Sequence, residues 1–106
     1  MSRRLSLCFA VVEANGTERD LGLKGQYART MRALIEAGAK GITALDVSGT
    51  WALRLSHYVF VLRREHGLSI TTDWEPHDGA SGPGRHGRYR LHTPAQLIGG
   101  CEQEAA

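Results

Sequence analysis

The sequence predicts an α+β fold in which three helices are followed by a two-stranded hairpin. Two observations carry this prediction. Residues 43–65 show two helical patterns separated by a glycine, and residues 69–91 show two alternating segments separated by a Gly-rich stretch. An apolar segment ahead of the helices adds an N-terminal strand or hairpin extension. With 106 residues, of which 42% are hydrophobic, the chain suits one small domain with a single core.

The N-terminal residues 5–13, LSLCFAVVE, are rich in β-branched and aromatic side chains and indicate a strand. Asn15-Gly16 follows as a tight-turn signal, and Thr17 to Asp20 return as a second short strand. We therefore assign residues 1–22 to an N-terminal strand or hairpin extension and residues 23–92 to the main domain. Residues 93–106 show little pattern and are expected to form a flexible C-terminal tail.

The first helix is expected over residues 24–37. Its apolar side chains recur at i, i+4, i+7 and i+8, which places them on one face: Tyr27, Met31, Leu34 and Ile35. Gly38 follows at the point where a left-handed residue commonly ends a helix.

The second helix is expected to be short and to begin at Thr43, whose hydroxyl can cap its first turn. Asp46 stands where a reciprocal cap would be. The helix should end near Ser48-Gly49, because Gly49 supplies the sharp turn that a helix-turn-helix needs.

The third helix is expected over residues 51–65, with Thr50 as its cap and Gly67 as its end. Its core face should consist of Leu55, Val59 and Leu62, at i, i+4 and i+7. A neighbouring face carries Trp51, Arg54, Tyr58 and Val61, with His57 beside it.

The hairpin is expected from residues 69–75 and 88–92, which alternate between two faces. Residues 76–87 contain four glycines and two prolines and are expected to form a flexible loop. If the strands pair, the acidic Asp73 and Glu75 share a face with Arg88 and Arg90. Such cross-strand charge pairs contribute roughly 0.2–1 kcal/mol.

The order helix, turn, helix, strand, loop, strand is that of a winged helix-turn-helix, whose second motif helix commonly enters the DNA major groove. The stretch RLSHYVFVLRREHGLSITTDWE and the later GRYRL resemble the variant winged-helix domain family of small bacteriophage and prophage proteins. The resemblance covers roughly residues 26–92 and is carried by Arg54, Leu55, Leu62, Arg63, Gly67, Ile70, Tyr89 and Leu91. It implies DNA binding in phage transcription or recombination.

The charge distribution agrees with a nucleic-acid partner. The formal net charge is only +2, but residues 21–67 carry seven positive and three negative side chains, an excess of +4. The excess positive charge therefore lies in the predicted helices.

A duplex DNA target would take the helix of residues 51–65 into its major groove. The predicted contacts from this helix are Thr50, Trp51, Arg54, His57 and Tyr58. Arg54 is the favoured base-reading residue, because its guanidinium matches guanine O6 and N7. The predicted phosphate contacts are Lys40, Arg63 and Arg64. From the hairpin, Arg85 and Arg88 are expected to reach a minor groove or a neighbouring phosphate.

Four of these contacts have a structural alternative. Trp51 and Tyr58 can belong to the core, and Arg63 and Arg64 can form a solvated face. The acidic residues of the hairpin, Asp73, Glu75 and Asp78, should repel phosphates, which predicts modest DNA affinity or a wing turned away from the duplex.

Enzymatic and metal-binding patterns are weak. Ser56 and His57 are adjacent on a helix, so their side chains diverge and form no nucleophile–base pair. The histidines of the hairpin region lack ligand spacing, and no helix follows its glycines as a phosphate loop requires. We expect no enzyme activity, no cofactor and no metal site. Cys8 and Cys101 lie near opposite ends of the chain, and a disulfide between them is possible in principle because the termini of a domain often lie close. Two reduced thiols of a cytoplasmic protein are the favoured expectation.

A membrane location is not expected, because no apolar run approaches the roughly 20 residues of a membrane helix. Residues 5–12 follow two arginines but are too short for a signal peptide and lack a cleavage pattern. The cytoplasm is the expected location.

The sequence thus favours a DNA-binding phage or prophage transcriptional regulator, acting on double-stranded DNA as a homodimer. The alternative is a protein-interaction winged-helix module with a host or phage protein partner, such as a phage-encoded inhibitor of a host defence complex. In that alternative the N-terminal strand, if exposed, adds to a partner's sheet.

Overall fold

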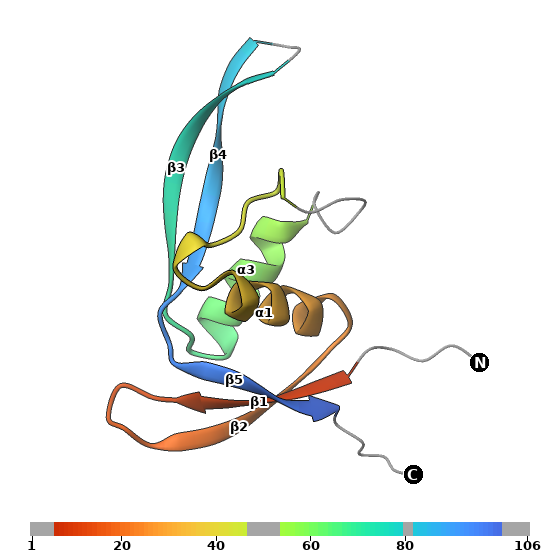
Figure 1. The fold of residues 1–106 in the computed structure, drawn as a ribbon, viewed down its shortest axis with the longest axis vertical. Coiled ribbons are helices and arrows are strands. Elements are labelled where there is room, and N and C mark those ends of the chain that lie inside the picture. Colours follow the sequence, from red (N-terminus) through yellow and green to blue (C-terminus); the bar gives the residue numbers. More distant parts are fainter. Residues whose placement is uncertain (1–5, 47–53, 80–81, 101–106) are drawn as a thin grey trace, which may run out of the picture.

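The computed structural model describes residues 6–46, 54–79 and 82–100, with the backbone alone of residues 77–79 and 82–85. Its elements are β1 (Ser6–Val12), β2 (Glu18–Lys24), α1 (Gly25–Ala37), the 3-10 turn η1 (Gly38–Lys40), α3 (Leu55–Glu65), β3 (Ile70–Gly79), β4 (Gly82–Leu91) and β5 (Ala95–Gly100). The two helices lie between a three-stranded sheet and the hairpin β3–β4, which projects from the body as a wing (Figure 1).

The three-stranded sheet has the antiparallel order β2-β1-β5. Alternate residues of β1, namely Leu7, Phe9 and Val11, are buried, as the pleat of a half-covered sheet requires. The predicted hairpin is confirmed: Gly16 turns the chain with φ 87°, and the Thr17 N–H donates to the Asn15 side chain at 2.9 Å.

Strand β5 corrects the predicted flexible tail. Ala95–Gly100 pairs with β1, with Leu97 opposite Phe9 and Ala95 opposite Val11. The short segment AQLIGG carries no readable alternation of its own, so only its neighbour β1 makes it a strand. Strand β1 is consequently flanked on both sides, so it does not offer the exposed strand on which the protein-interaction alternative drew.

Cys8 of β1 is disulfide-bonded, which corrects the expectation of a reduced thiol. It lies opposite Gly99, near the end of β5. The pairing of β1 with β5 brings the C-terminal end of β5 to Cys8. Cys101, the only other cysteine of the sequence, lies outside the described residues.

Helix α1 begins one residue later than predicted and ends at the predicted residue. Met31 and Leu34 of the expected apolar face are buried, together with Ala28. Gly38 ends the helix with φ 57°, and its N–H donates to the Leu34 carbonyl. The periodicity of the sequence therefore identified this helix correctly.

The segment after η1 joins the body to the wing. Ile42 and Tyr89 exchange two backbone hydrogen bonds of 2.9 and 2.8 Å, which add a one-residue bridge to the edge of β4. Gly41 precedes this bridge with φ 71°, and a Cβ at Gly41 would lie 2.5 Å from the Tyr89 carbonyl oxygen. Only glycine fits this approach.

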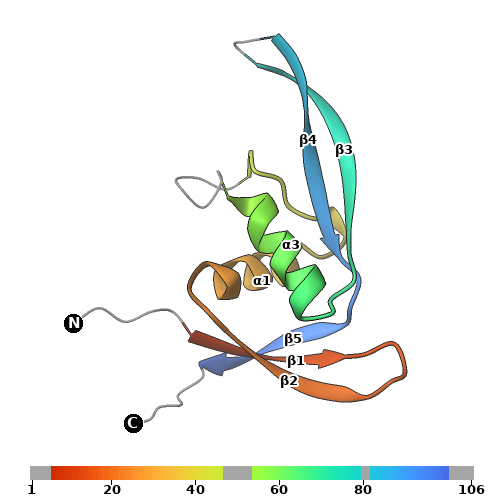
Figure 2. The same cartoon turned by 180° about the vertical axis from the view of Figure 1, so that it is seen from behind.

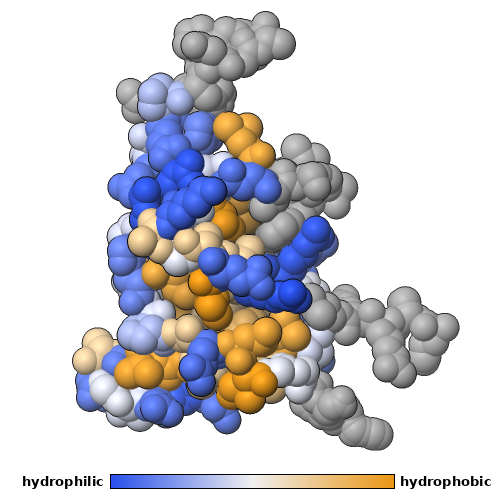
Figure 3. All heavy atoms as spheres, in the orientation of Figure 1, coloured by the Kyte–Doolittle hydropathy of each residue, from blue (hydrophilic) through white to orange (hydrophobic). Residues whose placement is uncertain are grey.

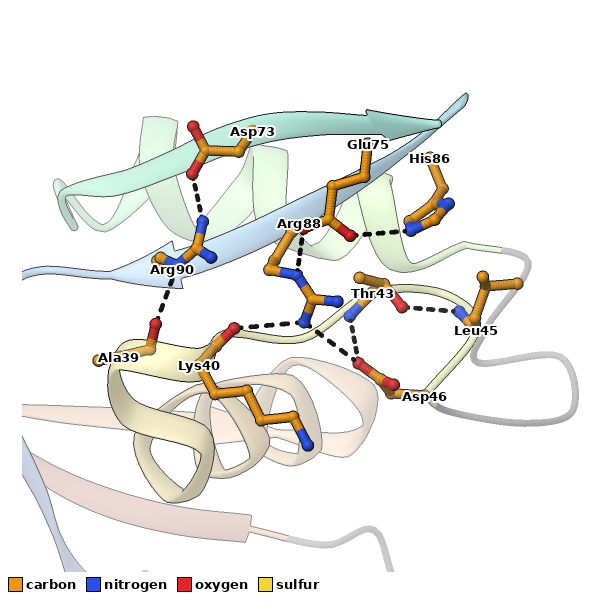
Figure 4. Close-up of polar contacts among 10 residues, drawn as sticks. All are labelled: Ala39, Lys40, Thr43, Leu45, Asp46, Asp73, Glu75, His86, Arg88 and Arg90. Atoms are coloured by element: carbon orange, nitrogen blue, oxygen red, sulfur yellow. Dashed lines mark hydrogen bonds and ion pairs between the residues drawn. The ribbon is translucent and has the colours of Figure 1, made fainter. Parts of the chain in front are cut away.

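The predicted reciprocal cap at Thr43 is confirmed (Figure 4). The Thr43 N–H donates to Asp46 Oδ2 at 3.0 Å, and the Leu45 N–H donates to Thr43 Oγ1 at 3.1 Å. Residues 44–46 form a turn, and the rest of the predicted second helix, with Gly49, lies outside the described residues. Two α-helices are therefore present in the described part of the chain, where the sequence predicts three.

Helix α3 follows Arg54, and the first residues of its predicted span lie outside the described residues. Leu55, Val59 and Leu62 are buried and form the predicted core face. Gly67, with φ 66°, lies just beyond the helix as predicted. Helix α3 packs against α1, and its buried face joins the core shared with the three-stranded sheet.

The wing is longer than predicted. Strands β3 and β4 pair continuously from Ile70 opposite Leu91 to Gly79 opposite Gly82. The expected loop over residues 76–87 is wrong, because most of these residues belong to the two strands. Each strand of a two-stranded hairpin has an unpaired edge, so prolines such as Pro76 and Pro83 are tolerated there.

Candidate nucleic-acid interface

Helix α3 presents an exposed stripe opposite its buried core face. We call this stripe the outer face of α3, and it consists of Ser56, His57, Phe60, Arg63 and Arg64, all exposed. The spacing i, i+4, i+7 and i+8 places Ser56, Phe60, Arg63 and Arg64 on neighbouring turns. Viewed from behind, α3 lies in front of α1 and beside the base of the wing (Figure 2).

The two arginines of the outer face are held in different ways. Arg63 Nη2 donates to Thr72 Oγ1 of β3 at 3.2 Å and so links the helix to the wing. Arg64 lies over the Phe60 ring, with 5.8 Å between its guanidinium carbon and the ring centroid. Burial raises the pKa of Tyr89, and the positive charge of Arg63 opposes this shift. Both guanidinium groups stay on the exposed side of the helix.

Phe60 is a candidate contact that sequence reasoning missed. It is 53% exposed, although it stands in the apolar run YVFVL, which reads as core. The helical phase carries the missing signal: each residue turns by about 100°, so Phe60 points well away from its neighbour Val59.

The N-terminal end of α3 lies against the start of α1. The Tyr27 hydroxyl is 3.5 Å from His57 Nε2, and the Tyr27 and Tyr58 rings meet edge-on at 5.3 Å between centroids. Lys24, Gly25, Gln26 and Arg54 complete the lining of a shallow hollow at this point. Tyr58 is half-buried, which supports a packing role for it.

The charged residues of the wing form a network with the segment that follows α1 (Figure 4). Arg88 Nε donates to Glu75 Oε2 at 2.6 Å, and Arg88 Nη1 donates to the Lys40 carbonyl at 3.2 Å. Arg90 Nε donates to the Ala39 carbonyl at 2.9 Å. These bonds fix the wing relative to η1 across nearly half of the sequence.

Each acidic residue of this network has a cationic partner. Asp73 pairs with Arg90, and Glu75 pairs with Arg88. The hydrogen bond from Arg88 lowers the pKa of Glu75, and the same bond raises the pKa of Arg88. The phosphate repulsion predicted for Asp73 and Glu75 is therefore weakened by their neutralisation.

Arg88 is occupied by contacts within the molecule. Its side chain is 19% exposed and lies 3.8 Å from Asp46 in addition to its bonds with Glu75 and Lys40. Successive strand residues face opposite sides, so Arg88 lies on the wing face away from the buried Tyr89. In the view of Figure 3 the wing is mainly hydrophilic, and hydrophobic and hydrophilic residues are mixed over the body below it.

The structure thus gathers four of the predicted contact residues on or beside the outer face of α3: Arg54, His57, Arg63 and Arg64. Lys40 is exposed at the end of η1, beside Arg88 and apart from this face. Thr50 and Trp51 lie outside the described residues, and so does the side chain of Arg85.

Two general features concern only the described residues. No group of three or more His, Cys, Asp and Glu side chains among them is placed to hold a metal ion. In the same part of the chain, no helix is both long and apolar enough to cross a membrane.

Comparison with known proteins agrees with this architecture. Residues 20–100 match the family described as "Winged helix domain". The match extends past the resemblance seen in the sequence and takes in most of the edge strand β2 and all of the edge strand β5. Neither a curated protein nor a solved structure matches the chain. The chain belongs to the winged helix domain family.

Proposed function

We propose that this winged helix chain binds double-stranded DNA with the outer face of α3 and thereby regulates transcription. The observation that carries the proposal is the composition of this face, which holds two arginines and a histidine and no carboxylate. Eleven helical residues span about 16 Å. A major groove about 12 Å wide accepts a helix of this kind.

The proposed contacts divide by chemistry. Arg54, just before the first turn of α3, reads a base edge, because recognition helices contact bases mainly with their N-terminal residues. Arg63 and Arg64 bind phosphates. The hydrogen bond from Arg63 to Thr72 holds the Arg63 side chain in position for this contact. The proposed contacts on the helix also include Thr50, Trp51 and His57. From the wing, the proposed DNA contact is Arg85. Lys40 is a peripheral phosphate contact, and Arg88 stabilises the wing.

The proposed location of the protein follows from a DNA target. A phage or prophage regulator works where its operator is, in the cytoplasm. Winged helix domains are typically DNA-binding modules without enzymatic activity, and we assign this chain no catalytic role.

A second copy of the chain is a further proposed partner. Strand β5 is an edge of the three-stranded sheet, carries no charged residue, and leaves Leu97 and Ile98 exposed. The other edge, β2, is blunted by the charged Glu18, Asp20 and Lys24. Uncharged apolar edges favour strand pairing, so we place the homodimer contact at β5.

The rival function is a protein-interaction module, such as an inhibitor of a host defence complex. Exposed apolar side chains favour it: Leu45 is 67% exposed and Trp74 64% exposed. Large aromatic residues on a surface are typical anchors of protein interfaces. This alternative would bury them against a host or phage protein.

A gel shift with duplex DNA from the gene's own upstream region tests the main proposal. Binding at low salt that weakens steeply as salt rises is expected, because phosphate contacts release counterions. Failure to bind any duplex at low salt would exclude DNA as the target. Affinity purification from the host, with a stoichiometric protein and no DNA recovered, would then establish the rival.

A further inference from the structure

Phe60 occupies the centre of the outer face of α3. Ser56 lies one turn before it and Arg64 one turn after it. The ring is 53% exposed, and Arg64 covers one side of it at 5.8 Å. A phenylalanine kept at such a position leaves apolar area in water until a partner covers it.

The chemistry of the major groove restricts what this ring can touch. Base edges present hydrogen-bond donors and acceptors, and thymine alone adds an apolar group, its 5-methyl. A phenylalanine ring offers no donor or acceptor for the other edges, nor for a phosphate. Its only favourable counterpart in the groove is therefore the methyl group of a thymine.

We propose that Phe60 is a specificity-determining residue that packs against the 5-methyl group of a thymine in the major groove. The inference rests on the proposed DNA-binding function and deepens it, because it names a base that the helix selects. Arg64 keeps the ring in place and supplies positive charge beside it.

The flanking charges favour DNA over a protein at this position. Arg63 and Arg64 stand on the same side as the ring, and Arg63 is fixed there by Thr72. This combination of one ring and two guanidinium groups complements a thymine next to phosphates. The apolar Leu45 and Trp74 lie on other segments of the chain and are not part of this face.

The test compares thymine with deoxyuridine, which lacks only the 5-methyl group. A tight-binding duplex is first selected from a random pool with the full chain, and each thymine is then replaced singly. We expect one replacement to weaken binding by the native protein about fourfold, which corresponds to ~0.8 kcal/mol for one buried methyl. The Phe60→Ala variant should bind the two duplexes equally.

Further variants make the result independent of the alanine variant. Phe60→Leu keeps an apolar group and should retain sensitivity to the methyl, whereas Phe60→Gln should lose it. Arg32→Ala, on α1 and outside the outer face, is the control and should retain the full effect. Thermal melting confirms that the variants fold, as expected for an exposed position.

Several outcomes would overturn the inference. The first is that no replacement of thymine by deoxyuridine weakens binding by the native protein. The second is that the selected binding site contains no thymine. The third is that Phe60→Gln loses as much binding on this replacement as the native protein does. In each of these the protein still binds DNA and the proposed function stands. If no duplex is selected at all, the function fails together with the inference, and a protein partner would take the ring instead.

Discussion

Arg88 Nε and Glu75 Oε2 meet at 2.6 Å across the two strands of the wing. The same guanidinium bonds the Lys40 carbonyl, 48 residues earlier in the chain. One side chain therefore neutralises an acid of the wing and anchors the hairpin to the body. This assigns Arg88 to the architecture of the wing, and the DNA contacts that we propose therefore centre on the outer face of α3.

The Arg88→Ala variant should lower the melting temperature by a few degrees. The change leaves Glu75 without its cation and removes the bond to η1, so the wing loses its attachment. Circular dichroism melting measures the effect. The control is Arg32→Ala, which removes a surface arginine paired with Glu36 within α1 and should change little. Equal melting of the two variants would show that the network contributes nothing.

Stability should fall in acid because of Glu75. Its folded pKa lies below the ordinary value of 4.5, so its contribution is complete above that pH. As the pH falls below 4.5 and through the lowered folded pKa, the carboxylate takes up a proton and the contribution is lost. Urea unfolding between pH 7 and pH 3 should show a shallower decline in Glu75→Gln than in the native chain. Parallel declines would rule out this role.

Gly41→Ala should destabilise the fold by more than the ~1–3 kcal/mol of backbone strain. Its φ of 71° and ψ of −179° lie in a region essentially reserved for glycine, which accounts for the strain. A Cβ would in addition lie 2.5 Å from the Tyr89 carbonyl oxygen. Gly38→Ala is the control, because φ is also positive there while nothing lies within 4 Å. Chemical denaturation should rank Gly41→Ala as clearly the more damaging change.

The proposed dimer contact predicts that Ile98→Lys yields a monomer with unchanged melting. The side chain is 56% exposed on the edge strand β5, so a lysine there blocks strand pairing without entering the core. Sedimentation equilibrium gives the oligomeric state. Asp20→Lys on the opposite edge strand, β2, should leave it unchanged. A native chain that sediments as a monomer would refute the contact.

Local patterns in the sequence identify the helices well. The spacing of Met31 and Leu34, and of Val59 and Leu62, gives both buried faces because helical periodicity is set within a few residues. The cap between Thr43 and Asp46 is equally local, because the two residues are three positions apart, and their spacing in the sequence predicts it. The charge pairing of the wing also followed from strand alternation alone.

The features that could not be predicted from the sequence depend on contacts between residues far apart in the chain. Strand β5 exists because β1 lies beside it, some 90 residues away in the chain. The wing extends through glycines and prolines because each strand needs pairing on one edge only. The role of Arg88 requires Lys40 to lie next to β4, and the exposure of Phe60 depends on which face of α3 the core takes.

The central claim is that DNA binds the outer face of α3, and the salt dependence of binding by Arg63→Ala/Arg64→Ala tests it most directly. Fluorescence anisotropy with one labelled duplex gives the dissociation constant at several salt concentrations for the native chain, this double variant and Arg32→Ala. We predict weaker binding by the double variant and a slope of log affinity against log salt that is shallower by about two, one for each phosphate contact removed. Arg32→Ala, which lies on α1, should match the native chain. A double variant with native affinity and native slope would contradict the account.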